Sequence, residues 1–170
     1  MFKNYYETII GHDLINKYSY KNTNCIVKVN KLMLDIDFKG TPSGSLLASS
    51  LLFMEVLLSQ NPKKKKLNPR NYTAKLKKGQ IIGYKVTLRK KKALRFIEEL
   101  YLNPTLTSSR NKIKCSNGFF QFEIKNILKF KGVDNYYRLF KNVPPIQITI
   151  IFNNVSKSQN NFMLKSLKIK

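Results

Sequence analysis

The stretch Ile81–Arg89 constrains the fold of this chain most, because its apolar and polar side chains alternate along nine residues. The apolar members share one face of a strand, at Tyr84, Val86 and Leu88, and the polar members share the other, at Lys85, Thr87 and Arg89. A strand with one apolar and one polar face is typical of an antiparallel sheet that is packed on one side and open on the other. The sequence therefore predicts such a sheet.

The other elements complete an α+β fold in a single domain over residues 1–170. Further strands are expected at 29–38, 119–129 and 146–152, and apolar residues at helical spacing predict helices at 2–18, 45–58, 91–102 and 158–168. Ser45 is the expected cap of the second helix. Residues 61–80 resemble a short strand followed by an exposed basic loop, at about 63–79, and residues 103–117 are expected to be irregular. We expect an antiparallel sheet with helices packed on one face and the other face free to bind a partner.

The net charge of +23 indicates what that partner is, since 32 lysines and arginines face only 9 aspartates and glutamates. Like charges repel across a compact fold, so this excess favours a polyanion, most often a nucleic acid, with an anionic membrane surface as the alternative. Disorder also accompanies high charge, but 42% hydrophobic residues are enough to build a core.

The sequence gives little support for a membrane protein, a zinc-binding protein or a disulfide-rich protein. The most apolar stretch, Leu46–Leu58, is interrupted by Glu55 and is shorter than the roughly 20 residues that a bilayer requires. Cys25 and Cys115 lie far apart, in no CxxC pattern, which predicts neither a zinc site nor a disulfide scaffold. Binding to a membrane surface would need a basic amphipathic helix, whereas the basic residues cluster on loops and a strand, so no membrane association is expected.

No set of residues predicts catalysis. His12 is the only histidine, and no motif supplies the nucleophile and orienting group that a catalytic base requires. Glu98 and Glu99 are adjacent on a helix, so they diverge and are expected on a solvated face. We expect no enzymatic activity; the alternative is an accessory protein of RNA processing, or a subunit of an RNA-modifying enzyme.

Two carboxylates, Asp35 and Asp37, share the polar face of the predicted strand at 29–38. They could hold a Mg²⁺ ion shared with RNA phosphate, or pair with nearby lysines. No third ligand is evident, and no cofactor or metal of the protein's own is expected. Mg²⁺ is expected only as an ion bound by RNA.

The combination of basic and aromatic residues favours RNA as the polyanion that this chain binds. The run Lys63–Lys66 lies between an apolar helix and a strong strand, which would hold it against a phosphate backbone. Tyr20 and Tyr72 lie in basic loops, where their rings could stack on unpaired bases or instead form the edge of the core.

The stretch Lys75–Arg89, which reads KLKKGQIIGYKVTLR, closely resembles the hallmark of one universal ribosomal family, the large-subunit protein L-five. The family pattern is K-L-[RK]-x-G-x-x-[IV]-G-x-K-V-T-L-R. Other motifs of the family appear in order along nearly the whole chain, at Tyr20–Asn22, Val29–Asp35, Gly118–Phe130 and Ile146–Ile150.

The resemblance implies a protein of the central protuberance that binds 5S or large-subunit rRNA, beside neighbouring large-subunit proteins. The implied rRNA contacts are Tyr20, Lys21, Asn22, Lys28, Lys31, Lys85, Thr87 and Arg89. It also implies a basic loop that reaches the tRNA in the peptidyl site, through Arg70, Asn71, Tyr72, Thr73, Lys75, Lys77 and Lys78. A small-subunit head protein is implied as a partner across an intersubunit bridge.

Three departures from the family pattern are visible. Asp35 replaces the family's asparagine, Tyr72–Ala74 replaces the Ala-Gly-Phe tip of the tRNA loop, and Ser108–Lys114 replaces an R-D-F-R-G stretch. The chain is also rich in residues with A- and T-rich codons. This divergence favours a mitochondrial ribosome, with bacterial cytoplasm or a plastid as the alternatives.

Overall fold

The computed structural model describes residues 2–67, 79–103, 106, 110–116, 118–153 and 156–167, with the backbone alone at 110–116. In this part of the chain six strands form one antiparallel sheet in the order β2-β3-β1-β6-β5-β4. The strands are β1 (Val29–Asp37), β2 (Lys63–Lys66), β3 (Ile81–Arg89), β4 (Arg110–Ser116), β5 (Phe119–Ile124) and β6 (Ile146–Phe152). The expected fold class is confirmed.

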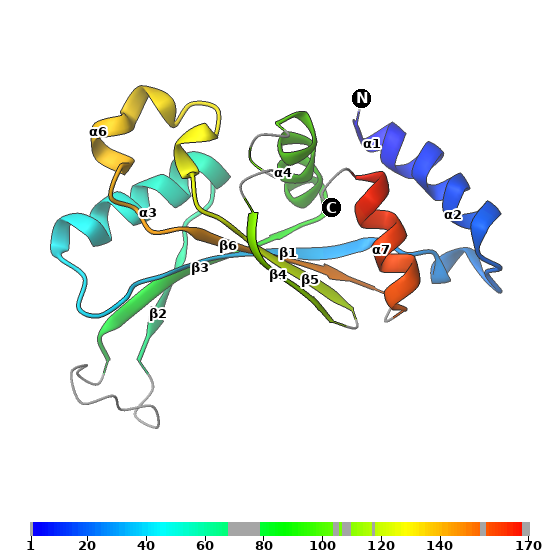
Figure 1. Ribbon diagram of the computed structural model, residues 1–170, viewed down its shortest axis with the longest axis horizontal. Helices are drawn as coiled ribbons and strands as arrows, with labels where there is room; N and C mark the ends of the chain where they lie inside the picture. The colour runs from blue at the N-terminus through cyan, green and yellow to red at the C-terminus, as the bar shows by residue number, and fades with distance from the viewer. Residues whose placement is uncertain are drawn as a thin grey trace.

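Helices cover one face of this sheet (Figure 1). The first helix runs as α1 (Phe2–Asn4), a wider π-helical stretch η1 (Tyr5–Ile10) and α2 (Gly11–Lys17). The longer helices that follow are α3 (Gly44–Leu58), α4 (Lys90–Leu102) and α7 (Lys157–Ser166). Short turns of helix are η2 (Thr23–Cys25), η3 (Ile127–Lys129), η4 (Asp134–Tyr136) and α6 (Tyr137–Phe140).

Strand β1 shows why the sheet has two different faces. Its residues Leu32, Leu34 and Ile36 are fully buried under the helices. Their partners on β3 are the apolar residues that the alternation placed on the same face, and on β6 they are Ile146, Ile148 and Ile150. Burying each of these side chains contributes about 2 kcal/mol to folding. The polar residues of β1 and β3 are thereby fixed on the opposite face, which we call the open face.

Aromatic rings join the helices above the sheet. Phe53 of α3 is fully buried and meets Phe140 with ring centroids 5.7 Å apart and Phe130 at 6.4 Å. Phe130 also contacts Phe96 of α4. The two Phe53 pairs are edge-to-face, a geometry that adds to the free energy of burial, and the Phe96–Phe130 pair is tilted. These contacts join α3, α4 and α6 in one helical layer.

Four expectations about local structure need correction. The cap of α3 is Ser43, whose hydroxyl accepts a hydrogen bond from the Leu46 amide at 3.3 Å; Ser45 lies inside the helix. The segment 103–117 is not wholly irregular, since β4 pairs with β5. The strand expected at 119–129 ends at Ile124, and η3 follows it. Residues Lys63–Lys66, which the expected basic loop at about 63–79 included, form β2, and residues 68–78 lie outside the described part.

Candidate nucleic-acid interface

The strand register brings four predicted RNA-binding residues together on the open face. Lys31 lies opposite Arg89, and Thr87 lies opposite Met33, across the β1–β3 pair. Lys85 lies opposite Asp35 two residues further along. Because alternate residues of a strand share a face, Lys31, Lys85, Thr87 and Arg89 all point away from the helical layer.

A groove of about 500 Å³ runs beside this set of residues. We call it the basic groove; its walls are Gln60, Asn61, Lys63, Lys85, Val86, Thr87 and Arg89. Lys63 is the cross-strand partner of Lys85, and both side chains line the groove. The groove thus combines three cations with amide and hydroxyl groups and has no carboxylate among its lining residues, a set suited to phosphate and ribose oxygens.

Three polar residues of the groove are absent from the predicted set: Gln60, Asn61 and Lys63. The sequence shows the run of lysines at 63–66, but it does not show the register in which that strand pairs with β3. Had β2 been placed beside β3, alternation would have put Lys63 and Lys65 on the open face and Lys64 on the other. Gln60 and Asn61 carry no signal of their own and line the groove because α3 ends just before them.

The carboxylates Asp35 and Asp37 are held by one lysine of β2. The Lys65 ammonium lies 2.6 Å from Oδ1 of Asp37, in a hydrogen bond, and 3.3 Å from Oδ1 of Asp35. Burial alone would lower the pKa of Lys65, but the hydrogen bond to Asp37 and the charges of both carboxylates together raise it. Pairing with a lysine is therefore the arrangement observed for the two aspartates, and Lys65 offsets part of their negative charge on the open face.

Replacing Lys65 with methionine is expected to destabilise the fold by about 1–2 kcal/mol at neutral pH, because Asp35, with a side chain only 12% exposed, loses its counter-charge. The raised pKa of Lys65 means that its contribution is complete below about pH 10.5, the ordinary lysine value, and is lost as the pH rises further. Urea unfolding of wild type and variant between pH 7 and pH 11 measures this difference. Lys64→Met is the matched control, and an equal loss there would contradict the role assigned to Lys65.

The N-terminal candidates lie apart from the groove. Lys21 and Asn22 are exposed in the turn before η2, and Lys28 is exposed just before β1. Tyr20 packs against the core, and burial raises the pKa of its hydroxyl. The position of Tyr20 therefore favours a core-edge role over a ring presented for stacking.

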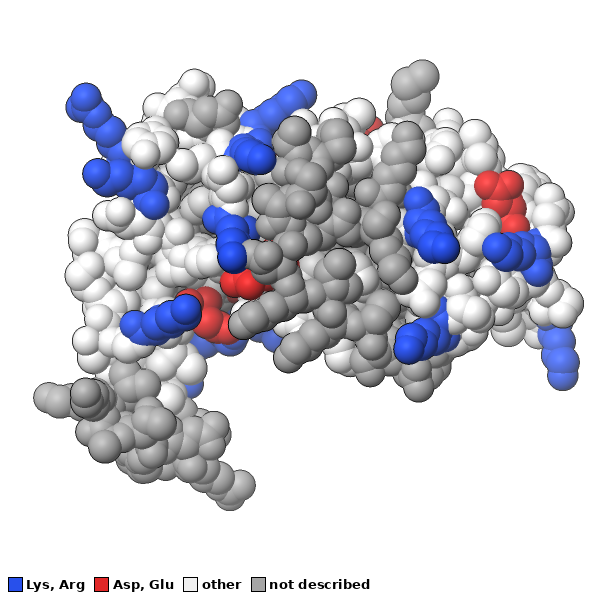
Figure 2. Space-filling model, viewed as in Figure 1, with Lys and Arg blue, Asp and Glu red and all other residues white. Residues whose placement is uncertain are grey.

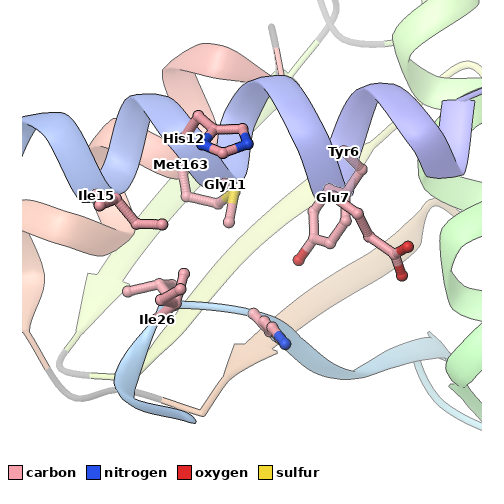
Figure 3. A pocket seen from close by; sticks show the side chains of 9 residues that line it. Tyr6, Glu7, Gly11, His12, Ile15, Ile26 and Met163 are labelled. Carbon is pink, nitrogen blue, oxygen red and sulfur yellow. The ribbon is translucent and has the colours of Figure 1, made fainter. Parts of the chain in front are cut away.

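Two contacts fix the segment that contains Lys28. Asn153, at the end of β6, accepts a hydrogen bond from the Lys28 amide at 2.7 Å and donates one to the Ile26 carbonyl at 3.0 Å. The Val29 amide donates to the Tyr6 hydroxyl at 2.9 Å. Between these anchors lies a pocket of about 180 Å³, with Tyr6 pointing toward the strand and His12 on the helix above (Figure 3). Lys28 is thus presented from a fixed backbone.

The residues predicted to contact tRNA lie outside the described part of the chain. They are Arg70, Asn71, Tyr72, Thr73, Lys75, Lys77 and Lys78. Their assignment stays a prediction. What the structure does describe is the base of that segment, where the Leu67 amide donates a hydrogen bond to the Gln80 carbonyl at 2.9 Å.

The described residues contain no cluster of three or more histidine, cysteine or acidic side chains placed to hold a metal ion. In the same part of the chain, no helix has the length and apolar character needed to cross a bilayer.

The expected solvated position of Glu99 is wrong: the side chain is partly buried beside Lys92 and Arg95. Burial raises the pKa of Glu99, while the charge of Lys131 opposes that shift. On the face that Figure 2 shows, lysine and arginine side chains lie in many separate places and acidic side chains in few.

Comparison with known proteins identifies relatives that match most of this chain, although no family model matches. The chain is 30% identical to large ribosomal subunit protein uL5m of Prototheca wickerhamii, over 91% of this chain and 72% of that protein. It is 27% identical to uL5m of Reclinomonas americana, over 98% of this chain and 95% of that protein. The bacterial protein uL5 of Blochmanniella floridana is 26% identical, over 98% and 90% of the two chains.

Proposed function

Because this chain belongs to the uL5 family of large ribosomal subunit proteins, we propose that its open face binds rRNA in the central protuberance. The chain is a structural constituent of the large subunit. The rRNA is 5S rRNA where the host ribosome has one, and otherwise a segment of the large-subunit rRNA. The proposed contacts are those of the predicted set other than Tyr20, which packs at the edge of the core: Lys21, Asn22, Lys28, Lys31, Lys85, Thr87 and Arg89.

The observation that carries this proposal is the basic groove. Lys63, Lys85 and Arg89 line it with no carboxylate among the lining residues, and Lys65 pairs with the two aspartates nearby. Each cation that meets a phosphate releases a condensed counterion, which favours binding by about 1 kcal/mol per contact at 0.1 M salt. Thr87, Gln60 and Asn61 supply uncharged groups for ribose and base edges.

We further propose that the segment between β2 and β3 contacts the tRNA in the peptidyl site. Its composition supports this, because four basic residues, Arg70, Lys75, Lys77 and Lys78, occur within nine positions of the sequence together with Tyr72. Neighbouring large-subunit proteins and a small-subunit head protein complete the proposed set of partners. The family membership supports ribosomal partners in general, and these particular contacts are our proposal.

The proposed role is binding without catalysis. Mg²⁺ enters this proposal only as an ion that the rRNA already holds, and the protein is proposed to need no cofactor. A basic accessory protein of RNA processing, or a subunit of an RNA-modifying enzyme, remains the competing function. The full-length similarity to uL5 proteins favours the ribosomal role.

A mitochondrial ribosome is the proposed location. The relatives named uL5m, one of which matches over 98% of this chain, support it. Bacterial uL5 proteins match over similar lengths, so the assignment also rests on the composition of the chain.

Sucrose-gradient fractionation of ribosomes from the source organelle tests the assignment. The chain should migrate with the large subunit and should cross-link to rRNA through lysines of the basic groove. Its absence from the large-subunit peak would overturn the ribosomal role. A variant with Arg70, Lys75 and Lys77 changed to alanine should enter the subunit normally but retain peptidyl-site tRNA less well. Failure of that variant to assemble would instead assign the segment a structural role.

A further inference from the structure

An aromatic and basic patch lies in the helical layer, away from the open face. Tyr136, Tyr137 and Leu139 are 52%, 56% and 50% exposed, three large apolar side chains within four residues. We call these three residues, with Arg138 and Lys141, the α6 patch. Exposed apolar residues are ordinarily scattered singly, so a group of three indicates a surface that a partner covers.

The patch is held in place by the core beneath it. The Tyr136 ring meets that of Phe140 at a centroid distance of 6.2 Å and an angle of 70°, and Phe140 is 1% exposed. Phe140 in turn packs on Phe53 of α3. The Lys141 amide donates a hydrogen bond to the Tyr137 carbonyl at 2.9 Å. An aromatic ring that is already ordered loses little conformational entropy when a partner binds.

The surroundings of the rings are positively charged. Arg138 and Lys141 are exposed, and residues 125–142 contain five basic residues and one acidic residue. A groove of about 350 Å³ separates α6 from the start of α3; it is lined by Ser43, Ser45, Leu46, Ser49, Arg138, Leu139 and Asn142. Basic side chains project at the end of the molecule where α6 lies (Figures 1 and 2).

From these observations we infer that the α6 patch binds an unpaired segment of RNA. Tyrosine faces accept unstacked bases of any sequence, and the cations beside them follow the phosphate backbone. Protein interfaces also use tyrosine and arginine but are depleted in lysine, and here lysine accompanies the rings. The patch lies on the helical side of the sheet and the basic groove on the open side, so the chain would hold two RNA segments at once.

Fluorescence anisotropy with the full chain tests this inference. The probes are a labelled oligoadenylate of about twelve nucleotides, which offers unpaired bases, and an RNA duplex of similar length, which does not. The double variant Tyr136→Leu/Tyr137→Leu keeps apolar groups at both positions but removes the aromatic faces. We expect its affinity for the oligoadenylate to fall by about 10- to 100-fold, and its affinity for the duplex to change less than about twofold.

Leu102→Ala is the control, because it removes a side chain that is 63% exposed elsewhere in the helical layer and should leave both affinities unchanged. Thermal unfolding checks that the double variant is folded. Equal losses for both probes, or no loss, would overturn the inference, and so would cross-links in assembled ribosomes that join the patch to a protein. Repeating the titration with Lys63, Lys85 and Arg89 changed to glutamine separates this patch from the groove: dependence on the tyrosines should persist there even if the proposed role of the groove fails.

Discussion

Changing Lys63, Lys85 and Arg89 together to glutamine should weaken binding to a 5S rRNA or central-protuberance rRNA fragment by about 10²- to 10³-fold at 0.1 M salt. The three cations line one groove, and each is expected to meet a phosphate. Glutamine keeps most of the side-chain length and the ability to hydrogen-bond. The loss should therefore report charge more than shape.

The salt dependence gives a second and sharper measurement. If all three phosphate contacts are lost, the slope of log K against log salt should fall in magnitude by about 3, since each contact contributes about 0.9. The control changes three exposed lysines outside the groove, Lys91, Lys157 and Lys165, to glutamine and so removes the same net charge. An equal loss of affinity and slope in the control would show that the groove has no privileged role.

Replacing Gly83 with alanine should destabilise the fold by about 3 kcal/mol. Gly83 is buried in β3 between β1 and β2, opposite Asp37 on one side and Lys65 on the other. A Cβ atom there would overlap the carbonyl oxygen of Ile36 and would lie 2.8 Å from Oδ1 of Asp37. Backbone atoms cannot move aside as a flexible side chain does, so β3 must separate locally from β1.

Chemical denaturation, with free energies extrapolated to water, measures this effect. Gly11→Ala is the matched control: Gly11 lies within the first helix, and a Cβ there would meet nothing within 4 Å. That change should stabilise the protein by about 0.5–1 kcal/mol, because alanine forms helix better than glycine. If Gly83→Ala unfolds at the same urea concentration as wild type, the close approach of β3 to β1 is not a requirement of the fold.

The alternation in Ile81–Arg89 was enough to predict a two-faced sheet, because burial on one face fixes the direction of every side chain in the strand. Lys31, Lys85, Thr87 and Arg89 could be assigned to one surface for that reason. Pairing between strands distant in the sequence was beyond this argument. Neither the position of Lys63 beside Lys85 nor that of Lys65 between two aspartates follows from periodicity, since both depend on the register of β2 against β3.

Short polar segments were the weakest part of the prediction. Residues 110–116 show little apolar alternation, yet their backbone pairs with β5 along the border of the sheet. An edge strand pairs with only one neighbouring strand and has less apolar surface to bury. Apolar and polar residues therefore alternate less clearly in its sequence. Conversely, Ser43 and Ser45 are equally good capping residues, and the position where the chain turns into α3 decided between them.

The position of β2 has a consequence for the chain before it meets RNA. Strand β2 ends the sheet order on its side, so one row of its backbone amide and carbonyl groups has no partner strand among the described residues. An exposed edge strand of this kind can pair with a strand of a second molecule, and such pairing leads to aggregation. Here all four residues of the strand are lysines, and two copies brought border to border would face each other with like charges at every position. The lysines of β2 thus oppose pairing between two free copies, and the phosphate contact proposed for Lys63 would lower this repulsion once the chain is bound to RNA.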